Sequence, residues 1–337
     1  MTRGLGLALV TIALLAAVAA PVTAPHAVDA HFAGLLNAPP TVVHIVHTDA
    51  DAGDFRGAGG AWHAPFIYRW HLVNQLEQRY EEDRSTRVPL AWFSRGHLVR
   101  SADDDAAPLL LLGADSYGRD VFTRLLFGAR TSLGLAVTAA LGAMLLGASL
   151  GGLAGFAGGA LDDVLMRGTD FVMVLPAIYV TLALRSVLPL VLTASQVFAL
   201  LAAIFAVVGA PFVARGVRAI VRSERRLDYT VAAQALGASD VRLLVRHLLP
   251  SARGFIAVQI TLLIPAFIIA EATLSYVGLG FPDPVASWGT MLHEASSNIR
   301  VFADFPWLLS PAAAMFLVVL GVNLVLQNST RDVKSLL

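Results

Sequence analysis

The chain has 337 residues, of which 56% are hydrophobic and 14% are charged. Because soluble globular proteins carry about 25% charged residues, this composition indicates an integral membrane protein. The 24 basic and 24 acidic residues balance, so the net charge does not predict a nucleic-acid partner. The absence of cysteine excludes disulfides, thiolate catalysis and cysteine-ligated metals. The one lysine, Lys334, follows no glycine-rich loop, so we expect no Walker A ATPase site in this chain.

Six apolar stretches are long enough to cross a membrane, since about 20 apolar residues span its hydrocarbon core. Residues 171–214 contain a single charge, Arg185, and the nearby Pro189 indicates two helices joined by a tight outer turn. We therefore predict an all-α polytopic membrane protein. Its helices are expected at residues 5–24, 131–157, 169–188, 195–214, 255–280 and 307–328.

Residues 1–24 allow two interpretations. An N-terminal transmembrane anchor is one, since the apolar run is long enough to cross the membrane. A cleavable signal peptide is the other, because Arg3, an apolar run and the small residues around Ala19 also fit that pattern. Cleavage would leave five helices and an external N-terminus.

Residues 25–110 are expected to form a small extra-cytoplasmic α+β insert between the first two helices. Strands are predicted at Thr41–His47 and Trp62–Trp70, with a turn at Asp49–Gly60 between them. The spacing of apolar residues within His71–Asp83 predicts a helix there.

Aromatic residues concentrate in this insert, and we expect them mainly to form its core. Anchoring at the membrane interface and contact with a binding protein are the alternatives. These residues are Trp62, Phe66, Tyr68, Trp70, Tyr80, Trp92 and Phe93. Seven of the nine histidines also lie here, but His44 and His47 are three residues apart and would point to opposite faces of a strand. We therefore predict no metal site.

Arginine placement predicts the topology. The segment 215–253 between the fourth and fifth helices is rich in arginine, and such short loops lie on the cytoplasmic side. Its arginines are Arg215, Arg218, Arg222, Arg225, Arg226, Arg242, Arg246 and Arg253. Alternation of the helices then places both termini in the cytoplasm and residues 25–130 outside.

The segment 215–253 also has an ordered helical pattern. Asp228 can cap a short helix that ends at Gly237, a residue that tolerates a left-handed conformation. Ser239 or Asp240 can start a second helix over Val241–Leu249, which we expect Pro250 to stop. The segment is either a rigid knob that contacts a partner or a basic loop that only orients the protein.

The run from Tyr229 to Pro250 resembles the "EAA" coupling loop of ABC-importer permeases. Ala232, Ala233, Gly237, Leu249 and Pro250 fall in register with that motif, whereas Val231 stands in place of its glutamate and His247 at an apolar position. Three further stretches are similar to the C-type permease of the dipeptide/oligopeptide/nickel subfamily. They are Leu112–Asp120, Gly158–Asp162 with Met166–Asp170, and Glu271–Gly280 followed by Ser287–Gly289.

The resemblance implies a permease domain over residues 111–337, which forms a path for peptides or related small solutes. It implies an inner-membrane complex with a second permease subunit, two ABC ATPase subunits and an extra-cytoplasmic substrate-binding protein. ATP and magnesium would bind the ATPases, so this chain would hold no cofactor. It also favours the anchor for residues 1–24. The residues implied in coupling are Tyr229, Ala232, Ala233, Leu236, Gly237, Ala238, Ser239, Asp240, Leu249 and Pro250.

Glu271 is an ionisable residue inside a predicted span, where charge is costly, so it should face protein or water. It could line the translocation path with Ser275, or form an interhelical contact with Asn323, which we favour because its neighbours are small residues. Asp163, Arg167 and Asp170 have the spacing of ion pairs along one helix.

Two other functions remain open from the residues alone. A membrane-anchored metal-dependent hydrolase would use the external His/Asp-rich segment, but it would need clustered ligands such as a His-Glu-x-x-His run, and the sequence has none. A secondary transporter would show internally repeated, broken helices, and we find no repeat.

Overall fold

The computed structural model describes residues 2–47, 61–176, 179–180, 183, 192–297 and 300–334. The chain divides into two compact units. One comprises Met1–Thr11, Ser132–Pro282 and Met315–Leu337, and the other Ile12–Thr131 and Asp283–Ala314.

The described residues contain five helices that are long and apolar enough to cross a membrane, which confirms a polytopic helical fold. These candidate spans are Gly4–Thr23, Val121–Ala157, Ala194–Glu224, Arg253–Tyr276 and Pro306–Leu326. The end of the helix predicted at 169–188, and the turn predicted at Pro189, lie outside the described residues.

The first helices begin earlier than predicted. α1 spans Thr2–Thr23, α2 spans Val121–Ala157 and α3 spans Gly159–Val174. α2 starts ten residues before the predicted position because Asp120 caps it: its carboxylate accepts hydrogen bonds from the backbone N–H groups of Phe122 and Thr123. The charges that suggested a later start therefore belong to the helix. α2 and α3 meet at Gly158 and Gly159, which have φ angles of 66° and 58° that glycine adopts without strain.

α5 spans Ala194–Glu224 and extends ten residues beyond the predicted end. Its last turns carry arginines that bind the carboxylates of α3. Arg218 donates to Asp162 at 2.6 Å, Arg222 donates to the same carboxylate at 3.4 Å, and Arg215 pairs with Asp170. Asp170 was expected to pair with Arg167 along one helix, and this is wrong because Asp170 pairs with Arg215 of α5 instead. The ion pairs of Asp162 were not predicted.

α2 and α5 pack at a row of glycines spaced four residues apart. A Cβ atom on Gly147 would lie 2.6 Å from the carbonyl oxygen of Ala210, and one on Gly155 would lie 2.7 Å from that of Arg218. Gly151, between them, approaches the backbone of Ala214 in the same way. Small residues at this spacing let two membrane helices approach at backbone distance.

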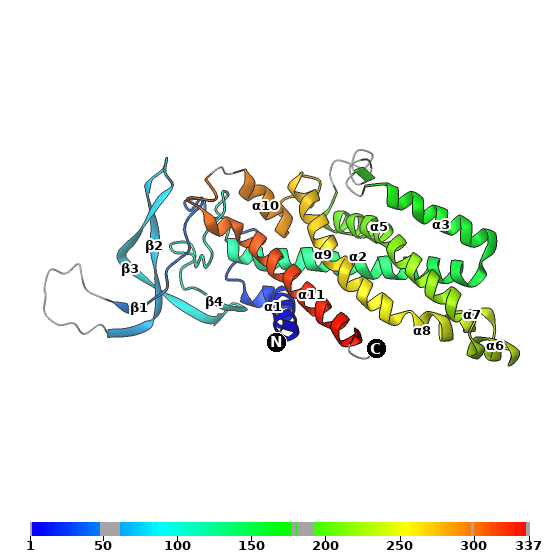
Figure 1. The fold of residues 1–337 in the computed structure, drawn as a ribbon. Helices are drawn as coiled ribbons and strands as arrows, with labels where there is room; N and C mark the ends of the chain where they lie inside the picture. Colours follow the sequence, from blue (N-terminus) through cyan, green and yellow to red (C-terminus); the bar gives the residue numbers. More distant parts are fainter. Residues whose placement is uncertain are drawn as a thin grey trace. The chain divides into compact units, whose positions relative to one another are not determined.

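The insert in the second unit is a four-stranded antiparallel sheet with the strand order β1-β2-β3-β4 (Figure 1). The strands are β1 (His44–His47), β2 (Ala61–Asn74), β3 (Arg79–Ser94) and β4 (His97–Ser101). The two predicted strands are confirmed. The turn predicted at Asp49–Gly60 lies outside the described residues.

The helix predicted at His71–Asp83 is wrong. These residues end β2 and begin β3, with His71 paired with Glu81 and Leu72 with Tyr80. The side chain of Asn74 accepts hydrogen bonds from the N–H groups of Leu76 and Glu77, which closes a turn in the middle of the predicted helix. The described residues of the insert thus form the expected sheet without the expected helix.

The aromatic side chains of the insert range from buried to exposed, and Trp70 and Tyr80 are half-buried. Phe66 and Tyr68 are buried, as expected of a core, whereas 54% of Trp92 and 81% of Phe93 are exposed. The expectation of a core position is wrong for Trp92 and Phe93, because they lie beside the β3–β4 turn. The side chain of Trp62 is outside the described part of the structure.

The remaining elements of the second unit follow residue 283. α10 spans Trp288–Ser296 and begins with a capping box between Ser287 and Thr290. A 3₁₀ turn, η2 (Pro306–Leu309), precedes α11 (Ser310–Lys334), whose later turns belong to the first unit. The apolar core here joins Val121 of α2 to Met291 of α10 and to Phe305.

Candidate functional site

The segment after α5 forms a helical knob, which we define as residues 225–252 (Figure 1). It contains α6 (Asp228–Ala235), α7 (Asp240–Leu243), the π-helical turn η1 (Leu244–Leu248) and α8 (Leu249–Ser251). α9 (Arg253–Tyr276) follows almost without interruption. The expectation that Pro250 stops the helix is therefore wrong: it occupies the first turn of α8, where a missing N–H costs nothing.

Gly237 makes the elbow of the knob. Its φ of 86° lies in the left-handed region, as predicted. The N–H of Gly237 donates to the carbonyl of Gln234 at 2.9 Å, and that of Ala238 donates to Ala233 at 3.1 Å, which is a Schellman motif. Ser239 then caps α7 by accepting from the N–H of Arg242. The turn between the two helices is therefore fixed by its own hydrogen bonds.

Asp228 does not cap α6, contrary to the sequence prediction. Leu227 takes the capping position without a side-chain hydrogen bond, and Asp228 lies in the first turn, where its charge suits the helix dipole. The hydroxyl of Thr230 donates to the carbonyl of Glu224 at 3.0 Å, and the hydroxyl of Tyr229 donates to the carboxylate of Glu224 at 2.6 Å. These two bonds join the start of α6 to the end of α5.

The knob buries one set of leucines and exposes other apolar side chains. Leu243 and Leu248 are buried. Leu249 packs against Gly152 of α2: a Cβ atom added to this glycine would lie 3.1 Å from the Leu249 side chain. In contrast, 90% of Leu236 and 72% of Val241 are exposed. Tyr229, Val231 and Val245 are also exposed. Ala232, Ser239, Asp240 and Pro250 lie on the surface, and Ala233 and Ala238 are half-buried. The knob is thus anchored on one side and presents aliphatic surface on another.

Glu271 on α9 is 1% exposed, and both of its carboxylate oxygens accept hydrogen bonds. The hydroxyl of Ser132 on α2 donates at 2.8 Å, and that of Ser275, one turn further along α9, donates at 2.7 Å. The expected contact with Asn323 is wrong, since the side chain of Asn323 is exposed and the serines supply the contacts. Glu271 therefore links α9 to α2.

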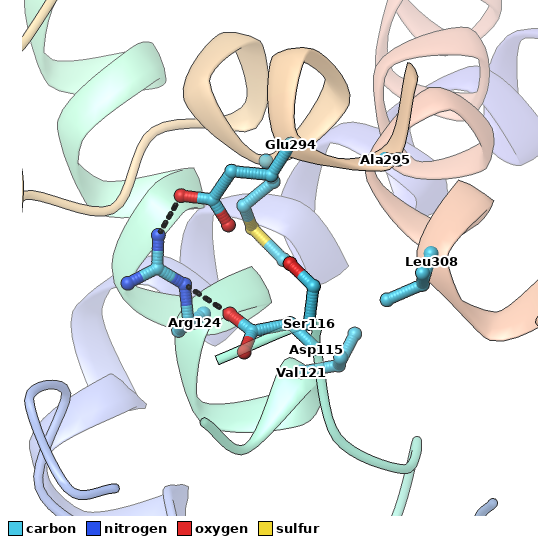
Figure 2. Close-up of a pocket in the computed structure, with 8 residues that line it drawn as sticks. Asp115, Ser116, Val121, Arg124, Glu294, Ala295 and Leu308 are labelled. Carbon is cyan, nitrogen blue, oxygen red and sulfur yellow. Dashed lines mark hydrogen bonds and ion pairs between the residues drawn. The ribbon is translucent and has the colours of Figure 1, made fainter. Parts of the chain in front are cut away.

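A second polar region was not predicted from the sequence; we call it the outer ion cluster because its segments are expected on the extra-cytoplasmic side. It consists of Asp115, Arg119, Arg124, Asp283 and Glu294. Figure 2 shows the guanidinium of Arg124 between the carboxylates of Asp115 and Glu294. Both arginines are 1% exposed, whereas Asp283 is 74% exposed.

Arg119 holds the outer ion cluster together. Its guanidinium donates to Asp115 at 2.7 Å, to Glu294 at 2.7 Å and to Asp283 at 2.9 Å. Arg124 donates to Glu294 at 3.1 Å. Burial raises the pKa of Glu294 above its usual range, although the charges of Arg124 and Arg119 oppose this shift. The i,i+4 spacing of Asp115 and Arg119 was the only local signal for the cluster, because Glu294 is 175 residues away from Arg119.

His26, just after α1, lies between two carboxylates. Its Nδ1 is 3.3 Å from Asp120, which caps α2, and its Nε2 is 3.7 Å from Asp104. Burial lowers the pKa of His26, but hydrogen bonds and charge interactions with Asp104 and Asp120 outweigh burial and raise the pKa to about 9. Among the described residues, no three His, Asp or Glu side chains are grouped as metal ligands would be.

Comparison with known proteins assigns the family. Residues 143–333 match the model for the inner membrane component of binding-protein-dependent transport systems. The chain is 39% identical over 214 residues to the oligopeptide transport system permease protein OppC of Bacillus subtilis, an alignment that covers 63% of this chain and 67% of that protein.

Two other relatives show the same degree of similarity. The glutathione transport system permease protein GsiD of Pectobacterium atrosepticum is 37% identical over 66% of this chain and 70% of its own length. The dipeptide transport system permease protein DppC of Alkalihalophilus pseudofirmus is 36% identical over 63% and 67%. The family match covers the helices that carry Glu271 and the knob. The chain therefore belongs to the family of binding-protein-dependent transport system inner membrane components and is a multi-pass transport subunit rather than an enzyme.

Proposed function

We propose that this chain is the permease subunit of an ATP-driven importer and forms the membrane path for peptides or related small solutes. The relatives are named as permeases for oligopeptides, dipeptides and glutathione, all of which are peptides. The complex would contain a second permease, two ABC ATPase subunits that bind ATP and magnesium, and an extra-cytoplasmic binding protein. Both termini would lie in the cytoplasm, on the same side as the arginine-rich knob.

The observation that carries the proposal is the structure of the knob. A conformational change in an ATPase subunit can move the membrane helices only if the element that joins them is rigid. Gly237 closes a hydrogen-bonded elbow, and Leu243 and Leu248 are buried beneath it. Leu236 and Val241 are exposed on the same short segment. The knob thus combines a firm attachment with apolar surface of the kind that packs into a protein groove.

The residues proposed to dock on the ATPase are those of the elbow and its flanking helices. They are Tyr229, Ala232, Ala233, Leu236, Gly237, Ala238, Ser239, Asp240, Leu249 and Pro250. Glu271 and Ser275 are proposed to connect helices rather than to bind substrate, because the carboxylate of Glu271 accepts from two serine hydroxyls and is buried.

The test exchanges Gly237 for valine and measures the ATPase that copurifies with the permease, together with peptide uptake. A β-branched residue is strained at positive φ, so the elbow should distort and both quantities should fall. Gly278 offers a matched control: its φ is 81°, it also has open space around it, and it closes the same motif at the end of α9. Gly278→Val should keep copurification normal. Normal copurification and uptake by Gly237→Val would refute the coupling role.

A further inference from the structure

We infer that the β3–β4 turn of the insert inserts Trp92 and Phe93 into the interface of the lipid bilayer, beside the end of α1. This inference goes beyond the transport function, since it concerns how the insert is held at the membrane. It rests on α1 crossing the membrane, and it does not depend on the substrate or on the coupling role of the knob.

The turn is tied to the end of a membrane span. The apolar part of α1, Gly4–Thr23, has 20 residues, which is about the thickness of the hydrocarbon core. The next residue, Ala24, must therefore lie near the boundary between lipid and water. The Nδ1 of His97, at the start of β4, donates to the carbonyl oxygen of Ala24 at 2.6 Å. Both residues belong to the same compact unit, so this contact sets the position of the turn relative to the end of α1, and hence to the membrane boundary.

The turn is tight and presents its aromatic residues outward. Ser94 pairs with His97, so that only Arg95 and Gly96 connect the strands. Both residues have positive φ angles, 50° and 86°, as two-residue hairpin turns require. Phe93 also has a φ of 50°, a conformation that is uncommon for a bulky residue. Trp92 and Phe93 thus end β3 next to this turn, and their side chains are exposed.

The composition of the turn fits a bilayer interface better than water. Tryptophan and other aromatic residues gather where acyl chains meet headgroups, and arginine can reach lipid phosphate there. Arg95 is exposed beside the two aromatic residues. Exposed apolar side chains of α1 continue to Val22, two residues before the contact with His97. The lipid-facing surface of α1 and the aromatic turn thus meet at the same depth.

The absence of cysteine allows a direct measurement of depth. A spin label would be placed on Phe93→Cys, in the complex with cysteine-free partner subunits reconstituted into phospholipid nanodiscs. Collisions with oxygen, which concentrates in lipid, would be compared with collisions with a water-soluble nickel complex. Thr86→Cys is the matched control, exposed on the same strand and roughly 20 Å away along it. Val18→Cys, 77% exposed on α1, gives the lipid reference.

We expect the label at position 93 to collide severalfold more with oxygen, relative to nickel, than the label at 86, and to lie at a shallower depth than the label at 18. Equal nickel access at 93 and 86 would place the turn in water and overturn the inference. Low access to both reagents at 93 would mean that a partner subunit covers the turn, and would overturn it as well. A label at 18 outside the lipid would overturn the premise that α1 crosses the membrane, without touching the coupling role of the knob.

Discussion

The knob exposes aliphatic side chains that its own chain does not cover, whereas the outer ion cluster buries two arginines among carboxylates. Leu236 has most of its surface exposed, and Arg119 has almost none. An exposed leucine contributes little to folding and is available to a partner. A buried arginine is tolerated only while its carboxylates remain in place. If the knob couples to an ATPase as proposed, the two regions separate contact with partners from the integrity of the fold, and substitutions in them should have different consequences.

The largest effect is expected when Arg119 is replaced by methionine. Asp115 and Glu294 would then remain buried with one guanidinium fewer, and breaking a buried ion pair costs about 3–5 kcal/mol. The thermal unfolding temperature of the purified protein should fall clearly. Arg226→Met in the knob is the control, and this exposed site should change stability by no more than about 0.5 kcal/mol. Equal unfolding temperatures for the two variants would contradict the comparison.

Protein stability should depend on pH through His26, which lies in the second unit. The pKa of His26 is about 9 in the folded protein, above its ordinary value of 6.5. Its stabilising contribution is therefore complete below pH 6.5 and is lost as the pH rises through 9. The loss is on the order of 3 kcal/mol, at about 1.4 kcal/mol per pKa unit. His26→Gln should remove this part of the pH dependence when thermal unfolding is measured between pH 6 and 10. An unchanged pH profile would show that His26 does not bridge Asp104 and Asp120 in its charged form.

The sequence predicted the membrane class, most helix positions and the glycine elbow, because apolar length and backbone freedom are local properties. It failed where a distant contact decides the structure. The span at 131–157 was predicted to start after the charge of Arg130, whereas α2 begins at Val121 and buries Arg124 against Glu294, 170 residues away. Leu72, Leu76 and Tyr80 repeat every four residues as in a helix, yet the turn at Asn74 makes them parts of a hairpin. The serine partner of Glu271 on α2 has no signal within one segment, and the outer ion cluster has only the i,i+4 spacing of Asp115 and Arg119.

The smallest of these effects is expected at Glu271, a buried acid whose carboxylate accepts hydrogen bonds from two serines. Glu271→Leu removes its hydrogen bonds with Ser132 and Ser275 and should cost about 0.6–2 kcal/mol. Glu271→Gln can still donate and accept, so stability and uptake per assembled complex should remain close to those of the wild type. A glutamine variant that assembles normally but fails to transport would assign Glu271 to the translocation path instead.

Crosslinking at the knob tests the central claim most directly. Leu236 and Leu76 are equally exposed, at 90% and 91%, and a cysteine at either position would be the only one in the chain. In the assembled importer, Leu236→Cys should crosslink to an ATPase subunit, and Leu76→Cys, in the turn between β2 and β3, should not. An active complex in which Leu236→Cys forms no crosslink, or in which Leu76→Cys reaches the ATPase, would contradict the assignment of the knob as the coupling element.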